Sequence, residues 1–317
     1  MIVKIGTRRS DLAIWQAEFV RDELIRHHPD IEVELVGVTT EGDRTLDVPL
    51  SEKGGKGLFL KEIEKELLNH NVDIAVHSMK DVTITDPVGL QIPVICERAS
   101  PFDAFVSTHY ENLESLPKNA RVGTCSLRRQ SILRHRFPDL EVENLRGNVN
   151  RRLQRLDNGD FDAIILAAAG LHRLDMADRI RQVIAPEVML PAVGQGAVGV
   201  QCREDDTNII ELIRPLNHLA TQCRVQAERA ANARLGGGCH VPVGAFAELD
   251  NGLLELRGFV GDPDGSQLIF ADMQGAKDAP NQTGYALAEK LLAQGAARIL
   301  EKFSDVGTQR SLCSFDT

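Results

Sequence analysis

The chain has 317 residues, about twice the usual length of one domain, so we expect two or three domains. Its 43% hydrophobic and 26% charged residues match a protein that folds around extended cores, which excludes a disordered chain. Because 46 acidic side chains outnumber 36 basic ones, the net charge is −10. This balance argues against nucleic acid or an anionic membrane as the partner.

Targeting and cysteine patterns predict a cytoplasmic protein. Residues 1–6 lead directly into a strand-like pattern and lack the basic start, apolar run and cleavage site of a secretion signal. The apolar runs are far shorter than the roughly 20 residues that a membrane helix needs. The six cysteines are scattered without a C-x-x-C pair, which is typical of reduced thiols. We therefore expect no membrane partner.

The first two thirds of the chain alternate strand-like and helix-like segments. Residues 2–6 have the pattern of a buried strand, and a polar turn at residues 7–11 leads into a helix. Further elements are predicted in this order: strand 31–35, helix 58–68, strand 73–76, strand 121–123, helix 126–137, strand near 141, helix after 148, strand 163–167. Strands that alternate with helices predict parallel sheets, with ligands beyond the carboxyl ends of the strands.

The pattern changes after about residue 215. A helix over residues 219–235 leads into three glycines, and the strands that follow are separated by turn sequences at 250–252 and 262–265. A final helix is predicted over residues 285–303. We therefore predict an α/β protein with two α/β lobes and a smaller C-terminal α+β domain, with residues 191–196 as a connector.

The distribution of arginines predicts an anionic ligand. Residues 121–155 contain nine arginines and three acids, a local charge of +6 in a protein of net charge −10. Three pairs lie at predicted helix starts: Arg8 and Arg9 before Ser10, Arg128 and Arg129 after Ser126, and Arg151 and Arg152 after Asn148. We expect Ser126 and Asn148 to be the N-caps of their helices. A helix N-terminus is itself positive, so cations there indicate a bound polyanion held by backbone N–H groups and guanidiniums. The alternative is that the arginines cover solvated helix faces. Nucleic acid is disfavoured, since only 4% of residues are aromatic.

Lys80 and Asp81 follow the strand predicted at residues 73–76. An acid at the carboxyl edge of a sheet can transfer protons or stabilise a cation. An Asp after a strand is more often a turn former or a helix cap. An arginine-lined cleft favours the functional interpretation, because opposite charges nearby keep a carboxylate ionised.

Cys239 follows three consecutive glycines. Such a loop is sterically open, so its thiol can project into a cleft. We expect the other five cysteines to be inert small hydrophobes, and we assign no role to His240. The cysteines and histidines show no paired ligand spacing, so no metal site is predicted.

Seven segments of the chain resemble signatures of the porphobilinogen deaminase family. They are GTRRS at 6–10, GKGLF at 55–59, HSMKDV at 77–82, GTCSLRR at 123–129, LRGN at 145–148, LPAVGQGA at 190–197, and ERAANARLGGGCHVPVG at 228–244. The last of these resembles the cofactor-attachment signature, and the segments follow the family order over nearly the whole chain. Two departures are small: Thr83 stands where the family usually has proline, and Gly236 where an acid is common.

The resemblance implies three domains, two of them α/β lobes similar to those of periplasmic solute-binding proteins. Residues 1–98 and 195–215 would form domain 1, residues 99–194 domain 2, and residues 216–317 an α+β domain 3 that carries the cofactor cysteine. We also expect a monomer.

The resemblance further implies a dipyrromethane cofactor joined to Cys239 by a thioether. Four porphobilinogen molecules would be added to this primer head to tail, each with loss of ammonia. Water would then release linear hydroxymethylbilane for tetrapyrrole and heme synthesis. The partners would be porphobilinogen and the growing polypyrrole chain, whose rings carry acetate and propionate groups that match the clustered arginines.

Residue roles follow from the matched motifs. Asp81 would be catalytic, stabilising the cation that forms when ammonia leaves and transferring protons. Cofactor binding is expected for Cys239, Lys80, Asp81, Thr124, Ser126, Arg128, Arg129 and Arg146. Substrate binding is expected for Arg8, Ser10, Lys56, Arg152 and Arg173. The roles of Arg9 and Arg151 stay open.

Two other functions compete with this one. A two-lobed anion-binding or solute-binding protein would also have βαβ lobes and clustered arginines, and fold alone does not separate the two. A cysteine hydrolase using Cys239 is the second, but no motif supplies its partner residues.

Overall fold

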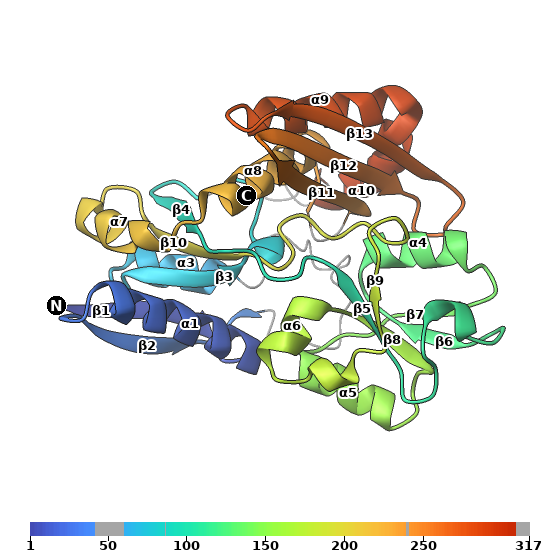
Figure 1. Cartoon of the computed structure of the whole chain (residues 1–317), viewed down its shortest axis with the longest axis horizontal. Helices are drawn as coiled ribbons and strands as arrows, with labels where there is room; N and C mark the ends of the chain where they lie inside the picture. The colour runs from blue at the N-terminus through green and yellow to red at the C-terminus, as the bar shows by residue number, and fades with distance from the viewer. Residues whose placement is uncertain (42–59, 86, 239–240, 309–317) are drawn as a thin grey trace, which may run out of the picture.

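The computed structural model describes residues 1–41, 60–85, 87–238 and 241–308. The strands of these residues form three sheets, and each sheet is the centre of one unit of the molecule. Figure 1 shows the first unit at the left, the second at the lower right and the third above them.

The first unit contains a five-stranded sheet with helices on both faces. Its strands, in spatial order, are β2 (Glu32–Val38), β1 (Ile2–Arg8), β3 (Ile74–Ser78), β10 (Val198–Arg203) and β4 (Leu90–Ile95). Helices α1 (Asp11–His27) and α7 (Thr207–Ile213) pack on one face, where Val20 and Leu24 of α1 are fully buried. Helix α3 (Lys61–Leu68) covers the other face with Ile63 and Leu67.

The second unit repeats this layout. Its strands, in spatial order, are β7 (Glu141–Glu143), β6 (Arg121–Gly123), β8 (Ala163–Ala167), β5 (Asp103–Val106) and β9 (Gln182–Ile184). Helices α5 (Val149–Asp157) and α6 (Ala168–Arg173) pack on one face, and α4 (Leu127–Arg136) packs on the other. The core around α4 continues into the third unit through Phe246 and Phe259.

The prediction of parallel sheets is wrong for one strand in each of these two sheets. Strand β10 runs antiparallel to β3 and β4, and β5 runs antiparallel to β8 and β9. Both strands follow a segment that crosses from the other unit: β5 comes after β4, and β10 comes after β9. A crossover helix returns the chain in the same direction, whereas these two strands enter their sheets without one.

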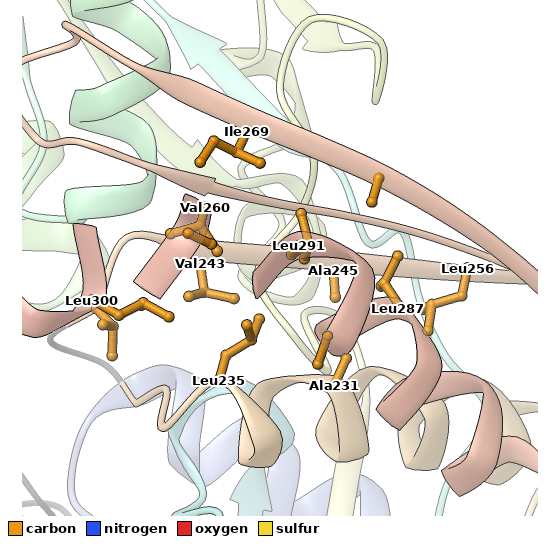
Figure 2. Packing of buried hydrophobic residues seen from close by; sticks show 14 of the residues in the cluster. Ala231, Leu235, Val243, Ala245, Leu256, Val260, Ile269, Leu287, Leu291 and Leu300 are labelled. Carbon is orange, nitrogen blue, oxygen red and sulfur yellow. The ribbon is translucent and has the colours of Figure 1, made fainter. Parts of the chain in front are cut away.

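The third unit is an antiparallel sheet covered by helices. It consists of β11 (Val243–Asp250), β12 (Leu253–Gly261), β13 (Leu268–Ala276), α8 (Leu219–Arg234), α9 (Pro280–Leu291), a π-helical turn (Leu292–Ala296) and α10 (Ala297–Thr308). Asn251 and Gly252 both have positive φ, as a two-residue hairpin turn requires. The helix predicted at 285–303 starts earlier and is interrupted at Gly295, where φ is 100°. Figure 2 shows Leu235, Val243 and Leu291 in the core between sheet and helices.

Two crossover segments connect the first and second units: the first runs from β4 to β5 and the second from β9 to β10. A buried ion pair joins the third unit to both of them. Arg98, after β4, places Nη1 2.6 Å from Oε1 of Glu228 on α8, and the two side chains are 1% and 0% exposed. The Glu228 carboxylate also accepts hydrogen bonds from the backbone N–H of Gly194 (2.8 Å) and of Ala247 (2.9 Å). Charge and hydrogen-bonding capacity are thus both satisfied, as a buried carboxylate requires.

Candidate active site

A cavity lies where the three units meet. Its lining comes from the turn after β3, the start of α4, the second crossover segment, α8 and the loop after α8. The charged and polar residues that line it are Lys80, Ser126, Arg128, Arg229 and Asn232. Among the described residues no acid lines this cavity, so its walls favour an anionic occupant.

The turn that carries Lys80 and Asp81 is a short 3-10 helix (Met79–Asp81) directly after β3. The Met79 N–H donates to the Ala197 carbonyl (3.0 Å), and the Ser78 hydroxyl is bonded to the Gln16 side chain on α1. His77 donates through Nε2 to Oε1 of Gln201 on β10 (2.9 Å). The turn is therefore fixed to two elements of the first unit.

Positive charge surrounds Asp81. Burial lowers the pKa of the Lys80 ammonium, the Asp81 carboxylate opposes this shift, and Arg129 adds to it. Burial likewise lowers the pKa of Arg152, to which Asp81 contributes in the opposite direction. Burial lowers the pKa of His77 to about 4, so this ring is neutral at pH 7. Lys80, Asp81 and Arg152 thus belong to one electrostatic cluster.

The start of α4 has the cap that the sequence predicts. Ser126 is the N-cap and its hydroxyl accepts from the Arg129 N–H, while the buried Thr124 hydroxyl accepts from the Ser126 N–H (3.3 Å). Asn148 caps α5 in the same way, through the Arg151 N–H (2.9 Å). Both caps are confirmed, because capping depends on residues that are close in sequence.

Arg128 and Arg129 are buried and share an acid that the sequence reasoning missed. Nη1 of Arg128 and Nη2 of Arg129 each lie 2.7 Å from the Asp103 carboxylate on β5. Gln195 donates to the same carboxylate (3.0 Å). Burial alone would raise the pKa of Asp103, but the two guanidiniums hold it far below its usual range. Asp103 lies outside the stretch 121–155, so a local charge count did not include it.

One buried polar atom in the group of Asp103, Arg128 and Arg129 has no hydrogen-bond partner among the described residues. It is Nε of Arg128, which is buried and belongs to a residue that lines the cavity. The other donors of this guanidinium bind Asp103 and the Leu190 carbonyl (2.6 Å). An unpaired N–H of a buried cation costs free energy, which an anionic ligand would recover.

The remaining predicted cations fall into two groups. Arg8 and Arg146 are half-buried, and Arg152 donates from Nε to the Gly147 carbonyl (2.8 Å) with Nη2 3.9 Å from the Cys125 sulfur. Arg9 and Arg151, whose roles stayed open, are exposed.

Ser10 and Arg173 lie apart from the cavity lining. Ser10 is the half-buried N-cap residue of α1, with no side-chain cap bond. Arg173 donates to the Gly196 carbonyl (2.7 Å) and its guanidinium carbon lies 5.4 Å from the centre of the Trp15 ring. It therefore contacts the second crossover segment and α1.

The end of α8 directs the chain into the cavity. The Gly236 N–H donates to the Ala233 carbonyl (3.1 Å) and the Gly237 N–H to the Asn232 carbonyl (2.9 Å), which is the pattern of a Schellman cap. Gly236 has the positive φ of 66° that this cap needs. Gly238 then lines the cavity. Cys239, the next residue, and Lys56 lie outside the described residues.

Two kinds of feature are absent from the described residues. None of their helices combines the length and the apolar character that crossing a membrane requires. No group of three or more His, Cys, Asp or Glu side chains in the same residues is arranged to hold a metal ion.

Comparison with protein families decides the identity of the chain. Residues 3–211 match the family model described as "Porphobilinogen deaminase, dipyromethane cofactor binding domain", and residues 222–293 match "Porphobilinogen deaminase, C-terminal domain". The chain belongs to the porphobilinogen deaminase family. As a member of this porphobilinogen deaminase family it is a hydroxymethylbilane synthase: a transferase that condenses four porphobilinogen molecules on a dipyrromethane cofactor with release of ammonia, in tetrapyrrole biosynthesis. Its partners are porphobilinogen and the growing polypyrrole chain.

Solved structures with a similar fold are distant from this porphobilinogen deaminase family member. The methionine-binding protein MetQ is 13% identical, with a TM-score of 0.45 over 74% of this chain and 94% of that chain. A periplasmic substrate-binding protein of an ABC transporter from Coxiella burnetii is 12% identical (TM-score 0.43; 69% and 94% covered). The periplasmic VFT2 domain of BvgS from Bordetella pertussis is 14% identical (0.38; 67% and 85%).

Two polar residues that line the cavity, Arg229 and Asn232, were not predicted as site residues from the sequence. Both lie within the signature at 228–244 of the porphobilinogen deaminase family, so a signal was present. It was not used, because the sequence alone does not reveal which neighbouring element is contacted by the helix face that these two side chains share.

Proposed function

We propose that the cavity between the three units and Asp81, the neighbour of the lining residue Lys80, form the active site, with Asp81 as the catalytic carboxylate and Cys239 as the attachment point of the dipyrromethane. One observation carries this proposal. Lys80, next to Asp81, and Gly238, next to Cys239, line the same cavity although 158 positions separate them in the chain. The resemblance predicts both residues independently of this placement.

The residues around the cavity fit a cofactor with several carboxylates. Lys80, Arg128 and Arg229 contribute positive charge to the lining, and Nε of Arg128 is buried without a partner among the described residues. The dipyrromethane would supply the pyrrole ring to which the chain is extended. The residues proposed to hold it are Lys80, Asp81, Thr124, Ser126, Arg128, Arg129 and Arg146. The residues proposed to bind incoming substrate and the growing chain are Arg8, Ser10, Lys56, Arg152 and Arg173.

Asp81 can perform two tasks in the reaction. Loss of ammonia from porphobilinogen leaves a cationic methylene-pyrrolenine, which a fixed carboxylate stabilises in a site of low dielectric. The same carboxylate can transfer protons while ammonia leaves and when the ring hydrogen is lost after coupling. Lys80 and Arg152 supply the positive charge beside it that binds the carboxylates of the pyrroles.

Intact-protein mass spectrometry tests the attachment point. The purified protein should exceed its sequence mass by two pyrrole units, and Cys239→Ala should have the sequence mass alone. Cys125→Ala is the matched control. It removes another thiol, which lies beside the proposed substrate-binding residue Arg152 and should not carry the cofactor, so this variant should keep the mass excess. A mass excess that persists in Cys239→Ala, or an active protein without any excess, would contradict the proposal.

Three further features complete the proposal. The protein would act in the cytoplasm, as a monomer and without nucleic acid. Light scattering of the purified holoenzyme would test the monomeric state. The domains would be residues 1–98 with 195–215, residues 99–194, and residues 216–317. The three sheets support this division, because each falls within one of these ranges.

A further inference from the structure

The segment that carries Asp81 is hydrogen-bonded on its N-terminal side to the first unit. Gln16 of α1 is buried and exchanges hydrogen bonds with the Ser78 hydroxyl (2.8 and 3.1 Å). The Met79 N–H binds the Ala197 carbonyl beside β10. These hydrogen bonds fix where the segment leaves the sheet. Towards the third unit, Met79 shares an apolar cluster with Val225 of α8, which is not directional.

On its C-terminal side the same segment is held by the third unit. Nη2 of Arg229 on α8 donates to the Thr83 carbonyl (2.8 Å) and to the Ile84 carbonyl (3.3 Å). Arg229 is half-buried and lines the cavity together with Ile84. A guanidinium that donates to two successive carbonyls defines both the distance and the direction of the chain it holds. The bonds go to backbone oxygens, so they do not depend on the threonine that replaces the usual proline.

A short, rigid path connects Arg229 to the loop that precedes Cys239. Asn232 lies less than one helical turn beyond Arg229, and its carbonyl accepts the Gly237 N–H of the Schellman cap. A Cβ at Gly237 would lie 1.8 Å from Oδ1 of Asn232, so any other residue there would force the Asn232 side chain to move. Gly238 then lines the cavity. The geometry of α8 therefore determines where the loop enters the site.

We propose that Arg229 is a positioning residue that sets the distance between the Asp81 segment and residues 236–238, the glycines that precede Cys239. This inference rests on the proposed function, in which these two residues carry the catalytic carboxylate and the cofactor. Arg229 acts through the backbone of residues 83 and 84 and does not itself need to contact the substrate. Small displacements matter here, because a misplacement of about 1 Å can reduce turnover roughly 100-fold.

Steady-state kinetics of three holoenzyme variants test the inference. Arg229→Met keeps an unbranched side chain similar to the stem of arginine and removes its donors, and Arg229→Lys restores a donor for the two carbonyls. Arg234→Met is the matched control, since Arg234 lies on the same helix, is exposed and pairs with Glu289 away from the cavity. The value of kcat is expressed per molecule that carries the two-pyrrole mass. Arg229→Met should lower it about tenfold to 100-fold with KM for porphobilinogen changed less than about twofold, and Arg229→Lys should recover most of the loss. Arg234→Met should leave both constants unchanged.

Other outcomes overturn the inference. A raised KM with unchanged kcat in Arg229→Met would make Arg229 a direct carboxylate ligand. A lowered melting temperature with normal kcat would make its role structural only. If Arg229→Met folds without carrying the cofactor, an Arg229→Lys variant that carries the cofactor supports the inference, and an Arg229→Lys variant that lacks it contradicts the inference. Normal turnover in Asp81→Asn would instead refute the proposed function, so the two failures can be told apart.

Discussion

Breaking the buried Arg98–Glu228 pair should destabilise the protein far more than breaking an exposed pair. Arg98→Met leaves the fully buried Glu228 carboxylate without its cation, although the N–H groups of Gly194 and Ala247 still donate to it. Removing one partner of a buried pair costs about 3–5 kcal/mol, because the remaining charge stays away from water. We expect a loss of unfolding free energy in this range.

Urea unfolding of the holoenzyme measures this loss. Fluorescence of the single tryptophan, Trp15, and far-UV circular dichroism should be followed together, because coincident curves establish one cooperative transition. The control is Glu187→Gln, whose carboxylate is 67% exposed and pairs with Arg257, and which should cost no more than about 1 kcal/mol. A loss below about 1 kcal/mol in Arg98→Met would refute the reasoning.

A double variant separates the effect of the unpaired charge from that of lost packing. Glu228→Gln removes the charge and keeps an oxygen that can accept from the two backbone N–H groups. Arg98→Met combined with Glu228→Gln should therefore be more stable than Arg98→Met alone. Equal or lower stability of the double variant would show that packing, and not the isolated carboxylate, causes the loss.

Three further predictions follow from the site. Asp81→Asn should keep the two-pyrrole mass but lower kcat at least 100-fold, because the variant lacks the charge that stabilises the developing cation; an assay of hydroxymethylbilane formation checks this. His77 has a folded-state pKa of about 4, below its usual 6.5, so the unfolded chain binds more protons between these values. Unfolding free energy should fall as pH drops from 6.5 to 4, by up to about 3 kcal/mol from this group, and His77→Gln should lose that part of the pH dependence. Asp103→Asn should cost about 3–5 kcal/mol in urea unfolding, since two buried guanidiniums lose their anion, whereas Asp160→Asn, which breaks a half-exposed pair, should cost about 1 kcal/mol or less.

Local features of the fold could be predicted from the sequence. The caps at Ser126 and Asn148 depend on hydrogen bonds to an N–H three residues ahead, and the hairpin turn at residues 251–252 depends on two adjacent residues with positive φ. The helix expected at residues 219–235 is also a local feature, and the structure has it at Leu219–Arg234. Such features need no knowledge of distant parts of the chain.

Long-range features could not be predicted in this way. The reversed directions of β5 and β10 follow from crossovers between two sheets, and the Asp103 carboxylate meets Arg128 and Arg129 only after β5 has been placed. Part of the charge of the clustered arginines is therefore balanced by the protein itself, and an anionic ligand for the group stays a prediction. The roles of the individual site residues remain predictions.

The insertion of β10 between β3 and β4 affects the order in which a nascent chain can fold. The second sheet is built from the continuous stretch of residues 103–184, whereas the first needs residues 198–203 to connect β4 with its other strands. During synthesis the second lobe can therefore be complete while the first still exposes the edges of β3 and β4. Unpaired strand edges favour aggregation, so a chain that ends before residue 198 would keep the edges of β3 and β4 open after its second lobe has folded.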